Sequence, residues 1–168
     1  FVATSNAALH FGANIDFIDI DPQTLNICPN LLEAKLKKAK FESALPDFLT
    51  VVHFGGSPCE METIYDLSIE YGFKIIEDAS HALGSSYKNK MIGENNFSLA
   101  SVFSFHPVKM ITTGEGGAIL LNSEKDQEKV RSLRSHGIVS TKSLEMNEKP
   151  GWYYEQDDLG YNFRMSEL

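Results

Sequence analysis

The stretch SVFSFHPVKMITTGEGG, residues 101–117, places a single lysine between an apolar run and a run rich in threonine and glycine. The apolar run 102–105 predicts a short buried strand that ends before Pro107. The glycines that follow allow a tight turn and a close approach of the backbone. The apolar run 118–121 predicts a second buried strand. We therefore expect Lys109 on a turn between two buried strands.

Two interpretations of Lys109 are open from these residues alone. Burial disfavours the ammonium form, so a lysine partly shielded from water has a lowered pKa. Its neutral amine could then attack a carbonyl group and form a Schiff base. The alternative is an ordinary loop lysine that faces solvent, which is the commoner case because lysines are rarely buried.

A second stretch, KIIEDASHALG at residues 74–84, predicts a buried strand that ends in Asp78, Ser80 and His81. A carboxylate at the carboxyl end of a parallel strand lies where ligands bind in open α/β sheets. Pyridoxal phosphate (PLP) enzymes need a Schiff-base lysine and an acid that keeps the pyridine nitrogen protonated. The two stretches together favour PLP chemistry.

The alternation of strands and helices predicts an α/β domain with a mainly parallel sheet flanked by helices. Apolar spacing and turn residues place the elements, and each range is approximate at its ends. We expect strands at 1–4, 14–21, 48–54 and 74–78, helices at 5–12, 30–39, 61–71 and 123–135, a hairpin at 85–93, and an irregular loop at 140–158.

Composition limits the classes of function. The 168 residues are 42% hydrophobic and 23% charged, which is typical of a folded domain. A net charge of −8 disfavours nucleic acid or an anionic membrane surface as the main partner. No apolar run approaches the roughly 20 residues that span a bilayer. Cys28 and Cys59 match no metal-ligand spacing, and two lone cysteines suit the reducing cytoplasm.

Four motifs occur in an order that resembles the DegT/DnrJ/EryC1/StrS family of sugar aminotransferases. The chain is most similar to the branch that acts in pseudaminic acid synthesis, and the resemblance covers essentially all of it. The motifs are EDASHA at 77–82, SFHPVK at 104–109, TGEGG at 113–117 and LGYNFRM at 159–165.

The resemblance implies a role for each matching residue. Lys109 would link covalently to PLP and, once displaced by substrate, would move a proton between the substrate and the cofactor. Asp78 would pair with the pyridine N–H, although a strand-end aspartate can also simply cap a turn. His81 would reach the phenolate oxygen of the ring, unless backbone carbonyls occupy its nitrogens.

The remaining implied contacts involve the cofactor phosphate and the face of its ring. Ser104 would donate to the phosphate, although a strand serine otherwise bonds to the backbone. Phe1 would stack on the pyridine ring, with ordinary core packing as the alternative. Asn162 would reach the phosphate of the partner subunit in a homodimer, unless it is a turn asparagine.

The resemblance further implies a fold-type I PLP-transferase large domain, of which residues 1–168 would be the central part. The chain is expected to lack an amino-terminal segment and a carboxyl-terminal small domain. The implied activity transfers an amino group from glutamate to a nucleotide-linked 4-keto sugar, with UDP as the expected nucleotide. The alternatives are a sugar dehydratase, although those relatives carry histidine in place of the lysine, and a truncated, non-catalytic chain.

Overall fold

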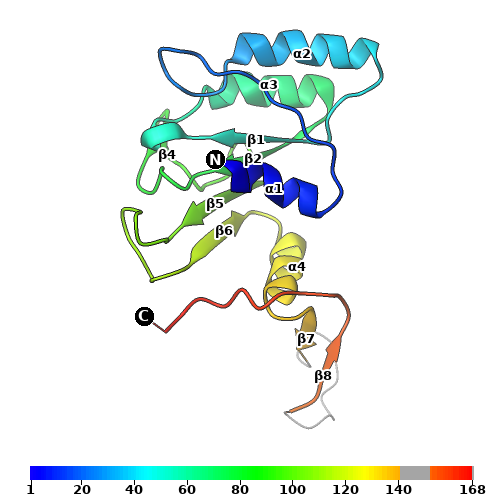
Figure 1. Ribbon diagram of the computed structural model, residues 1–168, viewed down its shortest axis with the longest axis vertical. Coiled ribbons are helices and arrows are strands. Elements are labelled where there is room, and N and C mark those ends of the chain that lie inside the picture. Colours follow the sequence, from blue (N-terminus) through cyan, green and yellow to red (C-terminus); the bar gives the residue numbers. More distant parts are fainter. Residues whose placement is uncertain (141–151, 168) are drawn as a thin grey trace. The chain divides into compact units, whose positions relative to one another are not determined.

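The computed structural model describes residues 1–140 and 152–167. These residues form two compact units, which are considered one at a time (Figure 1). Unit 1 comprises Phe1–Ser104 with Ala118–Leu120, and unit 2 comprises Phe105–Gly117 with Leu121–Leu168.

A four-stranded sheet with the order β1-β2-β5-β6 forms the centre of unit 1. The strands are β1 (Phe48–Val52), β2 (Lys74–Asp78), β5 (Ala100–Ser104) and β6 (Gly117–Leu121). Strand β2 pairs in parallel with β1 on one side and with β5 on the other. The carboxyl ends of these three strands therefore meet at one edge of the sheet, which is where open α/β sheets bind ligands.

The two faces of this sheet differ in burial. Along β2, Ile75 and Glu77 are buried, whereas Ile76 and Asp78 are half-buried. Along β5, Ser101 and Phe103 are buried, whereas Val102 and Ser104 are half-buried. Because successive side chains on a strand point to opposite faces, one face contacts the core and the other is partly open.

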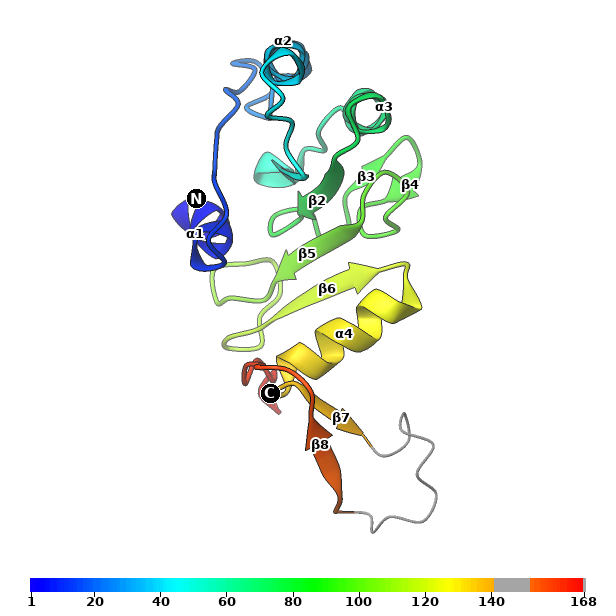
Figure 2. The ribbon, with the colours of Figure 1, turned by 90° about the vertical axis from the view of Figure 1, so that its right-hand side faces the viewer.

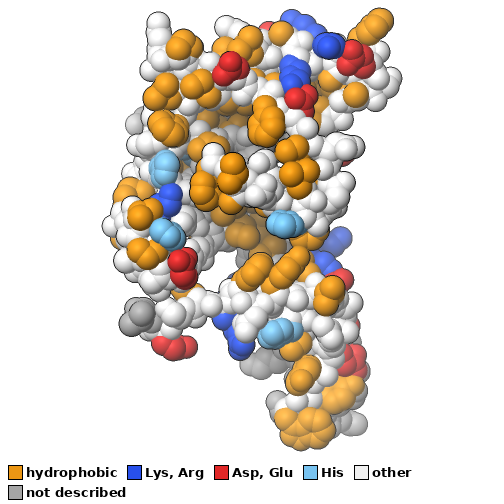
Figure 3. Space-filling view, viewed as in Figure 1, with side chains coloured by type: hydrophobic (Ala, Val, Ile, Leu, Met, Phe, Trp, Pro, Cys, Tyr) orange, Lys and Arg blue, Asp and Glu red, His pale blue; other side chains and the backbone are white. Residues whose placement is uncertain are grey.

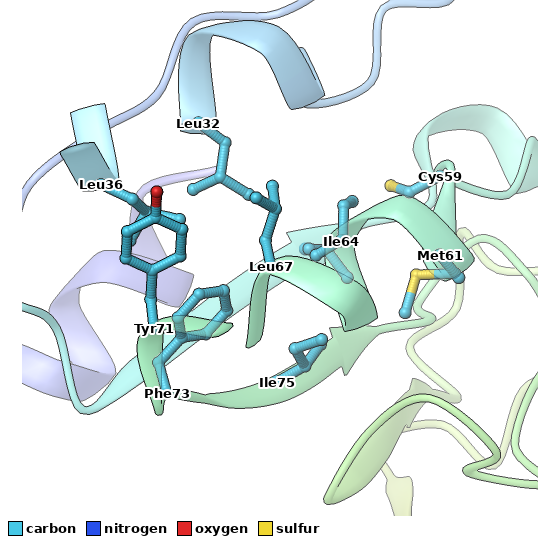
Figure 4. Close-up of a cluster of buried hydrophobic side chains, with 10 residues drawn as sticks. Leu32, Leu36, Cys59, Met61, Ile64, Leu67, Tyr71, Phe73 and Ile75 are labelled. Carbon is cyan, nitrogen blue, oxygen red and sulfur yellow. The ribbon is translucent and has the colours of Figure 1, made fainter. Parts of the chain in front are cut away.

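The core covers the buried face of the sheet. Helix α3 (Met61–Tyr71) packs against β2, and helix α2 (Pro29–Phe41) packs against α3 (Figure 2). Both helices present an apolar stripe at helical spacing, which drives their burial. Figure 4 shows the resulting cluster, which includes Leu32, Leu36, Ile64, Leu67, Tyr71, Phe73 and Ile75, with Cys59 and Met61 at one end.

Three smaller elements complete unit 1. Helix α1 (Val2–His10) contributes no buried side chain, and its Phe1, Val2, Leu9 and Phe11 are exposed. Apolar side chains are accordingly visible on the face that carries α1 (Figure 3). A single 3-10 turn, η1 (Phe54–Gly56), follows β1. The strands β3 (Ser86–Tyr87) and β4 (Lys90–Met91) form a short antiparallel hairpin.

Unit 2 contains helix α4 (Glu124–Arg134) and an antiparallel pair, β7 (Ile138–Ser140) and β8 (Tyr154–Gln156). The hydroxyl of Ser123 caps α4 by accepting a hydrogen bond from the N–H of Asp126. Helix α4 contacts β7.

Most of the expected elements are present, and several expectations are wrong. Residues 2–4 are helical instead of extended, and 14–21 form no strand beyond one isolated bridge at Ile20. Strand β6 is largely exposed instead of buried. The expected irregular loop contains the paired ends β7 and β8, while residues 141–151 of that loop lie outside the described part of the chain.

The α/β fold with a mainly parallel sheet is confirmed. Within residues 1–140 and 152–167, no helix has both the length and the apolar character needed to cross a membrane.

Candidate active site

Asp78 is the last residue of β2, and both of its carboxylate oxygens accept hydrogen bonds. Oδ1 accepts from the N–H of Ser80 at 3.1 Å, and Oδ2 accepts from the hydroxyl of Thr4 at 3.1 Å. The side chain is half-buried on the partly open face of the sheet.

Ser104 lies on the same face as Asp78, one strand away. Asp78 is opposite Val102 in the parallel register of β2 and β5, so their side chains point to the same side. Ser104 follows Val102 by two residues and therefore shares that side. The strand rise places Ser104 about 7 Å further toward the carboxyl edge. An acid and a hydroxyl thus project from neighbouring strand ends over one face.

His81 is exposed in the turn that follows β2. Its Nδ1 accepts a hydrogen bond from the N–H of Gly55 at 3.3 Å, and its ring makes an edge contact with Phe54. Because Nδ1 is an acceptor here, Nε2 carries the hydrogen and is the available donor. Gly56 brings η1 close to this turn: its φ is 83°, and a Cβ there would lie 2.8 Å from the carbonyl oxygen of His81.

Phe1 is the N-cap residue of α1, and its side chain is fully exposed. Thr4, one helical turn further on, donates to Asp78. Positions three apart lie on the same side of a helix, so Phe1 is on the same side of α1 as Thr4. Its expected stacking on a pyridine ring stays a prediction.

Lys109 lies in unit 2 and ends a tight turn. Its N–H donates to the carbonyl of His106 at 2.9 Å, and Pro107 occupies the second position of this turn, where its fixed φ is favoured. The Nδ1 of His106 accepts from the N–H of Val108. The lysine is half-buried, whereas its two neighbours in the chain are exposed.

The loop that carries Lys109 is closed by backbone hydrogen bonds. Phe105 donates to the carbonyl of Gly116 and accepts from the N–H of Thr113. Gly116 has no room for a side chain, because a Cβ would lie 2.2 Å from the Thr113 hydroxyl oxygen. The glycine at this position therefore lets the two ends of the lysine loop approach closely.

Asn162 lies in an extended segment of unit 2 that runs beside the end of α4, where it forms a bridge with Ser135. Its Oδ1 accepts a hydrogen bond from Nε of Arg164 at 2.7 Å. This contact assigns the amide orientation and leaves the NH2 group as the donor that faces outward. Such a donor suits an anionic oxygen.

The segment around Asn162 reaches the lysine loop within unit 2. The hydroxyl of Ser166 donates to the carbonyl of Thr113 at 2.8 Å, and Met165 lies against Gly116. Unit 2 thus brings the lysine loop and the asparagine segment together, while unit 1 brings together Asp78, His81 and Ser104. The implied contacts of Asp78 and Lys109 with one cofactor predict that both face one cleft, and this stays a prediction because they belong to different units.

The comparison with protein families bears directly on this arrangement. A model of a family described as the DegT/DnrJ/EryC1/StrS aminotransferase family matches residues 1–168. The chain belongs to the DegT/DnrJ/EryC1/StrS aminotransferase family. The resemblance that the four motifs indicated is therefore confirmed.

Individual members of the DegT/DnrJ/EryC1/StrS family are similar over nearly the whole chain. A UDP-4-amino-4,6-dideoxy-N-acetyl-beta-L-altrosamine transaminase of Campylobacter jejuni subsp. jejuni serotype O:23/36 (strain 81-176) is 45% identical over 168 residues. These are 100% of this chain and 41% of that protein. The chain thus spans less than half the length of this relative.

Solved structures of the same family share the fold. Helicobacter pylori PseC, an aminotransferase involved in the biosynthesis of pseudoaminic acid, is 36% identical with a TM-score of 0.82, over 98% of this chain and 40% of that one. An aminotransferase from Psychrobacter cryohalolentis is 30% identical with a TM-score of 0.83, over 98% and 40%.

The residues of unit 1 suit the polar groups of a PLP molecule. The Asp78 carboxylate suits a pyridine N–H, the Nε2–H of His81 suits a phenolate oxygen, and the Ser104 hydroxyl suits a phosphate. Gly55 and Gly56 keep the neighbouring turn free of side chains. The acid and the hydroxyl also share the partly open face of the sheet.

Sequence reasoning missed Thr4, which binds one oxygen of Asp78. No local signal could have identified it, because the two residues are separated by 74 positions and Thr4 was expected in a strand. It also assigned no role to His53, although this histidine directly follows β1 at the same sheet edge.

Proposed function

We propose that the whole protein is a PLP-dependent aminotransferase that transfers an amino group from glutamate to a UDP-linked 4-keto sugar. We place this reaction in the synthesis of pseudaminic acid or a related glycan. The observation that supports it most strongly is the family membership, together with a lysine, Lys109, in the SFHPVK motif whose resemblance implies the Schiff-base role.

Each candidate residue has a separate task in this proposal. Asp78 holds the proton on the pyridine nitrogen, His81 donates to the phenolate oxygen, and Ser104 binds the phosphate. Phe1 covers one face of the ring. PLP, when bound, acts as an electron sink for the carbon that loses its proton.

Lys109 accepts and returns the proton that moves during amino transfer. The turn from His106 to Lys109 and the closed loop around it fix the backbone of the lysine. A held backbone limits the positions that its Nζ can reach, which favours proton transfer at one atom.

The proposed assembly is a homodimer in the cytoplasm. Asn162 would donate from its NH2 group to the phosphate bound by the partner subunit. Its Oδ1 is already taken by Arg164, which supports a donor role for the amide. The two free cysteines, Cys28 and Cys59, are compatible with a reducing compartment.

The test uses the purified whole protein with PLP, glutamate and a UDP-linked 4-keto sugar. We expect a visible absorbance band on addition of PLP and formation of the 4-amino sugar. Lys109→Ala serves as the control and should lose both. Absence of the band and of product in the wild type would overturn the proposal.

The dimer is tested by mixing two inactive variants, Lys109→Ala and Asn162→Ala. A shared site predicts that mixed dimers regain activity, because one of their two sites has both residues intact. If mixed dimers form, as seen by mass, and no activity returns, the shared site is wrong.

A further inference from the structure

A pair of titratable side chains is buried directly behind Asp78. Glu77 precedes Asp78 on β2, points to the opposite face of the sheet and is 4% exposed. His53 follows β1 and is 0% exposed. Its Nε2 lies 2.7 Å from Oε2 of Glu77. Because a buried carboxylate is costly unless it is hydrogen-bonded, this contact has to be kept in the folded chain.

The hydrogen bonds fix the tautomer of the histidine. The N–H of Cys59 donates to Nδ1 of His53 at 3.1 Å, so that nitrogen carries no hydrogen. Nε2 is therefore the N–H nitrogen and donates to Glu77. The hydroxyl of Ser98 donates to the other carboxylate oxygen, Oε1. Both oxygens of Glu77 thus have a defined donor.

The pair continues into a network that crosses the sheet. Oδ1 of Asn95 accepts from the hydroxyl of Ser101 at 2.6 Å and lies 3.3 Å from that of Ser98. Nδ2 of Asn95 donates to the carbonyl of Leu120 on β6 at 2.8 Å. Within unit 1, side chains therefore connect the ends of β1 and β2 with β5 and β6.

The same histidine also binds the backbone of Asp78. The N–H of His53 donates to the carbonyl of Asp78 at 3.2 Å, and the next residue, Ala79, donates to the carbonyl of Val102 at 2.8 Å. His53 consequently holds β2 twice, through the Glu77 side chain and through the Asp78 main chain. The aspartate has little freedom to move away from the sheet edge.

We propose that His53 and Glu77 are positioning residues that fix the carboxyl end of β2, so that Asp78 meets the pyridine nitrogen in the correct place. This inference rests on the proposed function for its link to PLP. The role needs geometry and not the charge of Glu77, because both carboxylate oxygens act as hydrogen-bond acceptors within the network.

Two variants of the whole protein separate positioning from mere stability. Glu77→Gln keeps the shape and can keep the network: its oxygen accepts from His53, its NH2 donates to Ser98, and Ser98 turns to Asn95. The double variant His53→Leu/Glu77→Met replaces only the His53–Glu77 pair by apolar side chains of similar size. Protein cores often accept such a replacement of a buried pair.

Two measurements follow, the dissociation constant of PLP and amide hydrogen exchange in the PLP-free protein. We expect the double variant to bind PLP about 10-fold more weakly, as is common when a residue that supports a binding group is lost. Exchange at the backbone amides of positions 53 and 79 should be faster in that variant. Glu77→Gln should stay within about threefold of wild type in both measurements.

The outcomes are separable from those of the proposed function. If the wild type binds no PLP, the proposed function fails, while exchange at the backbone amides of positions 53 and 79 still decides the positioning role. The positioning role would be overturned if a folded double variant kept the PLP affinity and the amide exchange of the wild type. It would also be overturned if Glu77→Gln lost as much PLP affinity as the double variant. If the double variant does not fold, Ser98→Ala is used instead, because it removes the hydrogen bond from Ser98 to Oε1 of Glu77. We expect a smaller loss of PLP affinity and a smaller increase in exchange in this variant. No change in either measurement would refute the role.

Discussion

The hydroxyl of Thr4 donates to Oδ2 of Asp78 across 74 positions of sequence. Helix α1, which carries Thr4, has no buried side chain of its own. The bond therefore joins an otherwise loosely packed helix to the residue that we expect to bind the pyridine nitrogen. The order of helix α1 is therefore coupled to the hydrogen bonding of the Asp78 carboxylate.

Replacing Thr4 by valine should loosen α1 without unfolding the protein. Valine keeps the shape of threonine and removes the donor, and hydrogen bonds to charged groups contribute about 1.5–3 kcal/mol. We expect amide exchange in α1 to become about 10-fold faster or more, with little change in α3. Thr4→Ser is the control, because it keeps the hydroxyl. Equal exchange in all three proteins would show that the bond does not hold the helix.

Replacing Lys109 by arginine in the whole protein should abolish amino transfer. Arginine keeps the charge and roughly the length, but it stays protonated at any accessible pH and offers no lone pair. Turnover of a UDP-4-keto sugar with glutamate should fall by several orders of magnitude, and the visible band of the lysine-linked cofactor should be lost. A solvent-facing loop lysine would tolerate the change within about 0.5 kcal/mol of stability. Near-normal turnover would therefore refute the assigned role.

Replacing Gly137 by alanine should destabilise unit 2 more than the same change at Gly12 destabilises α1. The two glycines have similar φ values, 70° and 73°, so both substitutions carry the same left-handed backbone cost of about 1–2 kcal/mol. A Cβ at Gly137 would also lie 1.9 Å from the carbonyl oxygen of Asp158, whereas nothing lies within 4 Å at Gly12. Denaturant midpoints measure the difference, and equal midpoints would contradict the close approach.

Stability should decline between about pH 9 and 12 in a way that depends on Cys59. Burial, and next the negative charge of Glu77, raise the pKa of this thiol from its ordinary 9.0 to about 12. The unfolded chain loses the proton above pH 9 while the folded chain keeps it, so the contribution is complete below pH 9 and is lost as pH rises toward 12.

The Cys59→Ala variant isolates this contribution from other groups that titrate at high pH. The difference in unfolding free energy between wild type and variant should shrink by up to about 1.4 kcal/mol per pH unit in that range. A difference that stays constant from pH 8 to 12 would show that Cys59 ionises equally in both states.

The parts of the fold that the sequence predicted are those with strong local patterns. Helix α3 begins and ends as expected, and Ile64, Leu67 and Tyr71 are buried on its apolar face. Gly72 ends it with a left-handed φ of 80°, which only glycine adopts cheaply. The cap of α4 at Ser123 is likewise a local feature, because Ser123 accepts a hydrogen bond from the N–H of nearby Asp126.

Most of the wrong predictions depend on partners far away in sequence. Residues 14–21 alternate like a strand, yet no described strand pairs along them, and Phe17 is 69% exposed. Strand β1 is less buried than its apolar run suggested because it lies at the edge of the sheet. The start of α2 is at Pro29, before the expected cap at Asn30, since proline is favoured at the first helical position.

The candidate site was predicted residue by residue through its motifs, but its supporting contacts were not. Asp78 and Ser104 end neighbouring strands, as parallel pairing requires. The hydrogen bonds of Thr4 and His53 to Asp78 and Glu77 cannot be read from spacing, because they need the sheet to be formed first. The roles of all six candidate residues toward PLP stay predictions, those of Asp78 and Ser104 included.

The position of the core cluster in the chain has a consequence for the order of folding. Every residue of the cluster lies between Leu32 and Ile75, so its contacts close short loops. The contact of Thr4 with Asp78 closes a much longer one, and longer loops cost more entropy to close. Since short-range contacts form faster, we expect the core to assemble while α1 is still detached. A nascent chain would then have a packed core before Asp78 makes its contact with Thr4 on α1.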